Sequence, residues 1–238
     1  MTARIGTAGW SIPRAEADRV PGAGTHLQRY GQRLNAAEIN TSFYRPHRPA
    51  TYARWAESVP DDFRFAVKLP KAITHKARLV DCEDLLARFA GEVAGLGTKR
   101  GPLLVQMPPS FAYPGDVAER FFDMLDELVG GPVVVEPRHA SWYVPEVDAM
   151  LAERRIARVV ADPPVPEAAR MPGGWPDLLY IRLHGAPRVY WSSYDAAQID
   201  ALAARIAESD VETWTIFDNT ASGAALGNAL DLAERLLP

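Results

Sequence analysis

Short apolar runs recur along this chain at a regular spacing, and nearly every run ends in a polar residue. Such runs are typical of strands that are buried on both faces of a parallel sheet. We expect strands at 4–7, 35–39, 63–68, 102–106, 132–136, 156–161, 178–183 and 211–217. The polar residues at their ends are Thr7, Glu38, Lys68, Gln106, Glu136, Asp162, Arg182 with His184, and Asp218 with Asn219.

Segments with helical periodicity follow most of these strands. We expect helices at 25–33, 50–58, 82–96, 117–128, 145–154, 195–208 and 222–237, with Thr25 as the cap of the first. The interval between Asp162 and Leu178 differs, because it carries five prolines and two glycines. Proline removes a backbone donor and breaks helices, so we expect the sixth crossover helix to be short or missing.

The pattern as a whole predicts an α/β protein. Residues 1–238 match the usual size of a single-domain TIM-type (β/α)8 barrel with parallel strands. An open, doubly wound sheet is the alternative, since it also alternates strands with helices. Eight units with polar residues at nearly every strand end favour the closed barrel. In such a barrel all these ends lie on the carboxyl-terminal rim, where barrel enzymes keep their active sites.

Composition narrows the class of protein. Apolar residues make up 47% of the chain, which is ordinary for a globular protein with a large core. The net charge is −4, and this charge argues against a dedicated nucleic-acid binder. The single cysteine, Cys82, cannot form an intrachain disulfide and fits a reducing compartment. The first predicted strand begins at residue 4, so we expect no signal peptide. No apolar run approaches the roughly 18 residues of a membrane span. We expect a cytoplasmic protein with no membrane partner and an undetermined oligomeric state.

The strongest local signal for chemistry is Arg182-x-His184-Gly185. Alternation along a strand puts Arg182 and His184 on one side of the sheet. Arg182 would hold an anionic ligand while His184 acts as acid or base; alternatively, the two form a salt-bridge layer that holds the strands together. We expect Arg182 to face a water-filled pocket, so that removing it costs about 1 kcal/mol or less.

Glu136 and the residues after it form a second candidate cluster. Glu136 would be catalytic, and Arg138, His139 and Trp142 would contact the substrate. The alternative is that Glu136 pairs with Lys68 or Arg182 inside the barrel. Both can hold at once, because pairing shifts the pKa values that catalysis uses.

Other strand ends add further candidates. Glu38 is a possible general base, and Asn40 and Tyr44 are possible hydrogen-bond partners of a substrate, although Asn is also common in turns for structural reasons. Further candidate substrate-binding residues are Lys68, Gln106, Asp162 and Asn219.

No metal site or cofactor is expected. Glu38, Glu136 and Asp162 are acidic, but Lys68 and Arg182 lie among them and would repel a cation. The chain has five histidines, too few at strand ends for the dense metal clusters of some barrel enzymes. A phosphate-binding P-loop, a dinucleotide-binding glycine motif and a nucleophile elbow are all absent.

Several sequence blocks resemble one known family, the DUF72 or YecE-like bacterial proteins. These blocks are GTAGW (6–10), EINTSFY (38–44), FRFAVK (63–68), ITH (73–75), GPLLVQMPPSF (101–111), VEPRHASW (135–142), YIRLHG (180–185) and DNT (218–220). The resemblance covers nearly the whole chain in order. It implies a TIM barrel similar to those of sugar isomerases and of the endonuclease IV group of DNA-repair enzymes. Ala8 and Asp218 depart from the family pattern, which commonly has Ser and Asn there.

Three functions are compatible with these observations. The first is an enzyme that performs metal-independent acid/base chemistry on a small anionic molecule, phosphorylated or carboxylated. The second is a nucleic-acid-processing or nucleic-acid-binding protein that resembles endonuclease IV in fold. The third is a non-catalytic ligand-binding barrel. The sequence favours the first, but fold analogy alone is a weak basis for function.

Overall fold

The computed structural model describes residues 2–236 as an α/β fold with two sheets. One sheet has the strand order β1-β10-β9-β7 and the other β2-β3-β4-β5-β6-β8. All pairs are parallel except β6 with β8. The strands are β1 (Ala3–Thr7), β2 (Ala36–Ile39), β3 (Arg64–Lys68), β4 (Arg100–Gln106), β5 (Val133–Glu136), β6 (Ile156–Arg158), β7 (Val160–Asp162), β8 (Gly173–Gly174), β9 (Leu178–Leu183) and β10 (Glu212–Phe217).

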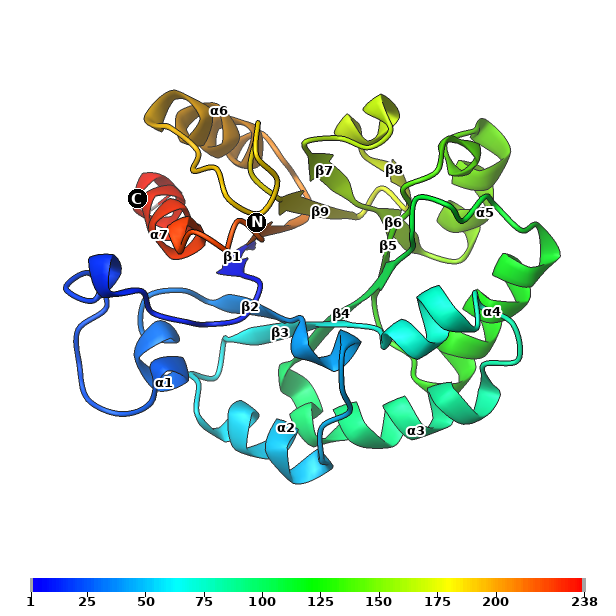
Figure 1. Cartoon of the computed structure of the whole chain (residues 1–238), viewed down its shortest axis with the longest axis horizontal. Helices are drawn as coiled ribbons and strands as arrows, with labels where there is room; N and C mark the ends of the chain where they lie inside the picture. The colour runs from blue at the N-terminus through cyan, green and yellow to red at the C-terminus, as the bar shows by residue number, and fades with distance from the viewer. Residues whose placement is uncertain (1, 237–238) are drawn as a thin grey trace.

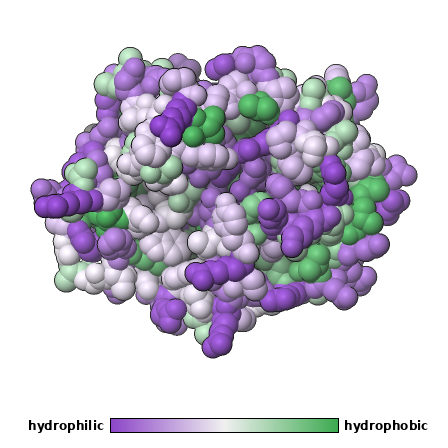
Figure 2. All heavy atoms as spheres, viewed as in Figure 1, coloured by the Kyte–Doolittle hydropathy of each residue, from purple (hydrophilic) through white to green (hydrophobic). Residues whose placement is uncertain are grey.

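Helices lie on the outer side of both sheets, with α2 to α5 along the larger sheet and α6 and α7 beside the smaller one (Figure 1). They are α1 (His26–Tyr30), α2 (Pro49–Glu57), α3 (Glu83–Val93), α4 (Asp116–Leu128), α5 (Pro145–Glu153), α6 (Ala196–Ala207) and α7 (Ala224–Leu236). Among residues 2–236, none of them combines the length and the apolar composition that a membrane span requires. On the face drawn in Figure 2, hydrophilic residues predominate and hydrophobic ones form small separate areas.

The predicted elements are confirmed with three differences. The helix predicted to run to residue 33 ends at Tyr30, and the helix predicted at 82–96 gives way to a 3₁₀ turn after Val93. The strand predicted at 156–161 is divided at Val159, because β6 pairs with β5 whereas β7 pairs with β9. The proline-rich interval holds only the 3₁₀ turn Glu167–Arg170 and the two-residue β8, so the expected lack of a full crossover helix is confirmed.

The core has two layers. One lies between the sheets and the helices, and the other lies on the opposite face of the strands and includes Leu104, Val134, Tyr180 and Ile216. Side chains alternate along a strand, so the residue two positions further on lies on the same face. Five strands place a polar residue two positions after a residue of this second layer: Glu38, Lys68, Gln106, Glu136 and Arg182. Asp218 follows Ile216 in the same way.

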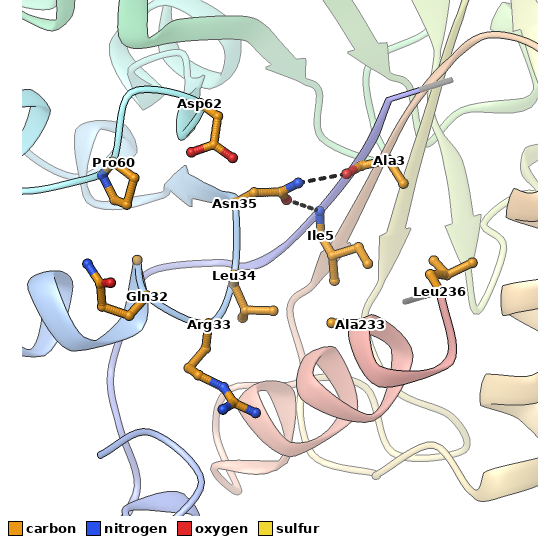
Figure 3. Close-up of a pocket in the computed structure, with 11 residues that line it drawn as sticks. Ala3, Ile5, Gln32, Arg33, Leu34, Asn35, Pro60, Asp62, Ala233 and Leu236 are labelled. Carbon is orange, nitrogen blue, oxygen red and sulfur yellow. Dashed lines mark hydrogen bonds between the residues drawn. The ribbon is translucent and has the colours of Figure 1, made fainter. Parts of the chain in front are cut away.

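Side chains join the two sheets where β1 passes β2. The Asn35 amide donates to the Ala3 carbonyl at 2.8 Å and accepts from the Ile5 N–H at 2.9 Å (Figure 3). The Tyr30 hydroxyl accepts from the Thr7 N–H at 2.8 Å and donates to the Ala36 carbonyl at 2.9 Å. These side chains take the place of a backbone ladder along this edge, beside a hollow of about 420 Å³.

Two contacts keep these strands close together. The Gly9 N–H donates to the Glu38 carbonyl at 2.8 Å, next to a parallel bridge between Ala8 and Glu38. A Cβ on Gly6 would lie 2.1 Å from the Ala36 carbonyl oxygen, so only glycine permits this approach.

The Tyr30 hydroxyl oxygen should by itself make a measurable contribution to the free energy of unfolding. In Tyr30→Phe, the buried Thr7 N–H and Ala36 carbonyl lose a shared partner, and we expect the free energy of unfolding to fall by about 1–3 kcal/mol. Tyr44→Phe is the control, because the Tyr44 side chain is 75% exposed and should change stability by less than about 0.5 kcal/mol. Urea unfolding of both variants measures the difference; equal stabilities would contradict this role for Tyr30.

Candidate functional site

Arg182 lies at the centre of a buried polar cluster at the carboxyl ends of the strands. Its guanidinium Nη2 and Nε donate to the two carboxylate oxygens of Glu38 at 2.7 and 3.0 Å. Nη1 donates to Glu136 Oε2 at 2.5 Å, and Nη2 also donates to Asp218 Oδ2 at 3.0 Å. The planar fork of arginine can satisfy several carboxylates at once in this way. Arg182 is 0% exposed, and four of its five N–H groups donate to these carboxylates.

This geometry corrects the expectation that Arg182 faces a water-filled pocket. The alternative interpretation applies, in which Arg182 pairs with Glu136 and holds neighbouring strands together. We therefore expect a large cost of removing Arg182 in place of the mild one, because three buried carboxylates would lose their counter-charge.

Glu38 is equally enclosed. Besides the two hydrogen bonds from Arg182, it accepts one from the Tyr180 hydroxyl at 3.1 Å, and it is 0% exposed. Both oxygens are occupied and no part of the side chain reaches solvent. The structure thus favours Glu38 as a group that orients Arg182 rather than as the general base proposed from the sequence.

His184 lies between two carboxylates at the end of β9. Its Nε2 is 3.1 Å from Glu136 Oε1 and its Nδ1 is 3.1 Å from Asp218 Oδ2. An ionised carboxylate only accepts hydrogen bonds, so both contacts form together when both ring nitrogens carry protons. Burial opposes the charge, but Glu136 and Asp218 outweigh it and raise the pKa of His184. The two contacts and the raised pKa both favour the protonated form of His184 at this position.

Arg138 and Tyr190 lie at the open side of this cluster. The Arg138 guanidinium donates to Glu136 Oε1 at 2.9 and 3.2 Å, and its side chain is 21% exposed. The Tyr190 ring packs edge-on against His184, with 5.7 Å between ring centroids. Tyr190 has a φ of +65°, an uncommon conformation for a residue other than glycine, and such conformations concentrate at functional sites.

Lys68 is a buried cation without a carboxylate partner. It is only 6% exposed, yet no carboxylate of residues 2–236 lies within salt-bridge distance of its Nζ. The Nζ lies 4.3 Å from the centre of the Phe43 ring, a cation–π contact. Burial, and then the charge of Arg182, lower the pKa of Lys68 to about 8.

The remaining predicted site residues fall into two groups. Gln106, 7% exposed, pairs in register with Glu136, and Asn40 follows β2 with a buried Oδ1 that has no hydrogen-bond partner in the described chain. Five others make structural contacts or lie away from Arg182, and the structure does not support them as parts of the cluster. They are Tyr44, His139, Trp142, Asp162 and Asn219.

Each of these five has a physical reason for its place. Tyr44 is exposed beside Phe43, and His139 Nδ1 caps the turn at Ser141. Trp142 is 0% exposed and donates its indole N–H to the Phe111 carbonyl, so it cannot form a wall of the site. Asp162 accepts from the Tyr194 hydroxyl at 2.7 Å, and the Asn219 amide donates to Ser192 and Asn228.

Three residues in or beside the cluster were not among the candidate site residues named from the sequence. Tyr180 shares a face with Arg182 and His184 through the same alternation, so that signal could have identified it. Asp218 was named as a strand-end residue but not as a candidate site residue, because it departs from the family pattern, yet it contacts both Arg182 and His184. Tyr190 comes from a loop and had no periodic signal.

The donor set does not suit a cation. Within residues 2–236, no group of three or more His, Cys, Asp or Glu side chains is arranged to hold a metal ion. The carboxylates of Glu38, Glu136 and Asp218 converge on the Arg182 guanidinium, which occupies the place a metal would take.

The cluster should stabilise the protein most between about pH 4.5 and 6.5. Burial opposes ionisation of Glu136, but Arg182 and Arg138 outweigh it and hold its pKa well below 4.5; Arg182 and His184 likewise lower the pKa of Asp218. The stability from these carboxylates is present above their unfolded pKa values and is lost as pH falls through the folded values. The contribution of His184 is complete below its unfolded value of 6.5 and is lost as pH rises through its raised folded pKa.

A substitution of His184 tests this window. We expect His184→Gln to lose most stability relative to the wild type near pH 5.5, and less at pH 9, when measured by urea unfolding at each pH. The same substitution at His26, which is exposed, serves as the control. A difference between His184→Gln and wild type that is constant from pH 5.5 to 9 would contradict a charged His184.

Comparison with known proteins identifies the family. Residues 4–238 match the family model described as "Protein of unknown function DUF72". The chain belongs to the DUF72 family. The resemblance inferred from the sequence blocks is thereby confirmed.

Two curated relatives carry UPF0759 names. The chain is 31% identical over 172 residues to the UPF0759 protein YecE of Escherichia coli strain K12, a match that covers 70% of this chain and 61% of that protein. It is 22% identical to the UPF0759 protein YunF of Bacillus subtilis, with 98% of this chain and 94% of that protein covered. The chain thus spans less than two thirds of the length of the E. coli relative in that match.

Solved structures of the family share the fold. A DUF72 family protein from Enterococcus faecalis superposes with a TM-score of 0.82 at 23% identity, covering 99% of this chain and 95% of that chain. One from Thermotoga maritima gives 0.79 at 25% identity, covering 99% of both chains. A sugar phosphate isomerase/epimerase from Parabacteroides distasonis gives 0.58 at 11% identity, covering 100% and 97%. This last likeness shows a TIM-barrel-like fold alone.

Proposed function

We propose that this DUF72 protein binds a small anionic molecule at the carboxyl ends of its strands and transfers protons to or from it. The observation that supports this most strongly is Lys68, a buried ammonium with no carboxylate partner in the described chain. An unpaired buried charge is costly, and such arrangements are concentrated at functional sites. A phosphate or carboxylate at Lys68 would supply the missing counter-charge.

The polar groups of the cluster divide into two sets. Lys68 and the partly exposed Arg138 would hold the anion. Both ring nitrogens of His184 contact carboxylates, so His184 would donate a proton only after the bound molecule takes the place of Glu136 at its Nε2. Glu136 and Asp218 would keep His184 protonated and oriented. Arg182 and Glu38 would position these carboxylates without touching the ligand. The assignment requires no metal ion and no organic cofactor.

The ligand class follows from this charge arrangement. Both candidate anion-binding groups are cations, and the carboxylates nearby are already satisfied by Arg182 and His184. A phosphorylated or carboxylated small molecule fits such a site better than a neutral or cationic one. The Parabacteroides neighbour is named for sugar phosphates, which are molecules of this class, although its 11% identity gives that name little weight here.

We also propose that the two sheets close into one eight-stranded ring within a single domain. The Asn35 and Tyr30 hydrogen bonds and the Ala8–Glu38 bridge support closure on one side. On the other side the chain passes directly from β6 in one sheet to β7 in the other. Closure would bring Glu38 and Arg182 together on neighbouring parts of one rim, as their hydrogen bonds require.

Calorimetric titration with inorganic phosphate tests the proposed site. We expect saturable binding at pH 7 that weakens at least tenfold in Arg138→Gln, a loss of about 1.4 kcal/mol. Arg120→Gln is the matched control, because Arg120 is exposed on α4, and it should leave the affinity unchanged. Acetate is titrated in parallel, because a carboxylated ligand would also fit.

Two other outcomes would favour the alternative functions. Tight binding of a single-stranded oligonucleotide, with an affinity that collapses as salt rises, would favour a nucleic-acid-binding protein. No binding of phosphate or acetate by wild type, or equal binding by Arg138→Gln, would contradict the anion site and favour a structural role for the cluster.

A further inference from the structure

A groove outside the polar cluster has an unusual combination of walls and charges. It lies between the turn Thr41–Phe43, the segment that follows β3 and the helix α3, and its volume is about 180 Å³. Its apolar walls are Phe43, Pro46, Pro70, Ile73, Leu85 and Phe89. A dry apolar cavity of about 150 Å³ is large enough to bind benzene. The groove is therefore the size of a single ring.

Basic side chains surround this apolar floor. Arg45, Lys71, Lys76 and Arg88 line the groove, and Glu92 is the one acidic residue among its lining residues. Glu92 already pairs with Arg88 at 2.9 Å. The other three cations have no carboxylate of residues 2–236 within salt-bridge distance, so the positive charge at the groove is not neutralised by the protein.

Tyr44 adds an exposed aromatic surface. It lines the groove with 75% of its surface accessible, and its ring packs edge-on against Phe43 at 5.0 Å. The exposed face of an aromatic ring suits a planar ligand. This position accounts for Tyr44 lying apart from the Arg182 cluster.

We propose that this groove is a second binding site, for a small aromatic molecule that carries one anionic group. The ring would lie between Phe43, Ile73 and Phe89, and its carboxylate or phosphate would face Lys71, Lys76 and Arg45. Phe43 separates the groove from the cluster, since Lys68 Nζ lies against the same ring at 4.3 Å. The groove is independent of the anion site proposed at Lys68 and Arg138.

The probe is 4-methylbenzoate, titrated by calorimetry against the full chain. Acetate has the charge without the ring, and 4-methylbenzyl alcohol has the ring without the charge. We expect 4-methylbenzoate to bind saturably and at least tenfold more tightly than either of them. Ala72→Trp, which fills the groove from its lining, should weaken binding at least tenfold, whereas the control Ala112→Trp, at an exposed position outside the lining, should not.

Charge variants keep the test decisive if Ala72→Trp does not fold. The double variant Lys71→Glu/Lys76→Glu should weaken 4-methylbenzoate binding at least tenfold, and Lys68→Met should leave it within about threefold of wild type. Absence of saturable binding, or equal affinity for 4-methylbenzyl alcohol, would overturn the proposal. Binding that is lost in Lys68→Met but kept in the groove variants would overturn it too, because the ring would then lie in the Arg182 cluster. None of these outcomes would contradict the separate proposal that Lys68 and Arg138 bind phosphate.

Discussion

Arg182→Ala should lower the free energy of unfolding by about 3–5 kcal/mol, the usual cost of breaking a buried ion pair by removing one partner. Glu38, Glu136 and Asp218 would remain buried with less compensating charge. Proteins are stable by only about 5–15 kcal/mol, so this loss would be a large fraction of the total. Urea unfolding at pH 7 measures it.

Two comparisons show whether the loss comes from the stranded carboxylates. Arg170→Ala removes an arginine from an exposed pair with Glu167 and should leave the free energy of unfolding nearly unchanged. Arg182→Lys keeps the charge but not the three-way fork, and it should be intermediate, which preserves the test if Arg182→Ala does not fold. The cost of Arg182→Ala should shrink as pH falls and the carboxylates are protonated. A cost near 1 kcal/mol at pH 7 would show that solvent screens these groups after all.

Lys68→Met, unlike Arg182→Ala, should raise the free energy of unfolding, and it should abolish anion binding. The folded protein lowers the pKa of Lys68 from 10.5 to about 8, so holding the charged form costs free energy. Replacing it with an apolar side chain of similar length should raise the free energy of unfolding at pH 7 by on the order of 1–3 kcal/mol. The thioether would also pack well against Phe43.

The pH dependence gives this prediction a sign. Below pH 8 the charged form bears its full penalty, and the penalty disappears as pH rises from about 8 to 10.5. The stability advantage of Lys68→Met should therefore be greatest below pH 8 and vanish near pH 10.5. Lys71→Met, at an exposed position, is the control and should show no such trend. A less stable Lys68→Met that still binds phosphate would mean that Lys68 is an ordinary structural cation.

The order of strands and helices could be predicted from apolar periodicity, because buried parallel strands and amphipathic helices leave that signal in the sequence. The split of the sixth strand at Val159 could not, since it depends on which neighbour each half finds. The contacts of Tyr30 and Asn35 between β1 and β2 were likewise invisible, because they join segments through single side-chain atoms.

The candidate site, too, could be predicted from the sequence only in part. Alternation correctly brought together Glu136, Arg182 and His184, and the strand-end rule added Lys68. It could not show that Arg182 is saturated by carboxylates while Lys68 is not. That distinction depends on distances between side chains from separate strands. Trp142 was misplaced for a related reason, since a residue near a strand end can turn back into the core.

The central claim is that an anion binds at the Lys68 ammonium. The most direct test is NMR titration of protein labelled with carbon-13 at lysine Cε, followed from pH 6 to 11 with and without saturating inorganic phosphate. The Lys99 resonance, from a side chain outside both proposed sites, serves as internal reference. We predict that Lys68 titrates near pH 8 in the free protein and that phosphate raises its pKa toward the ordinary lysine value of about 10.4. The same pKa with and without phosphate would contradict the proposed anion site.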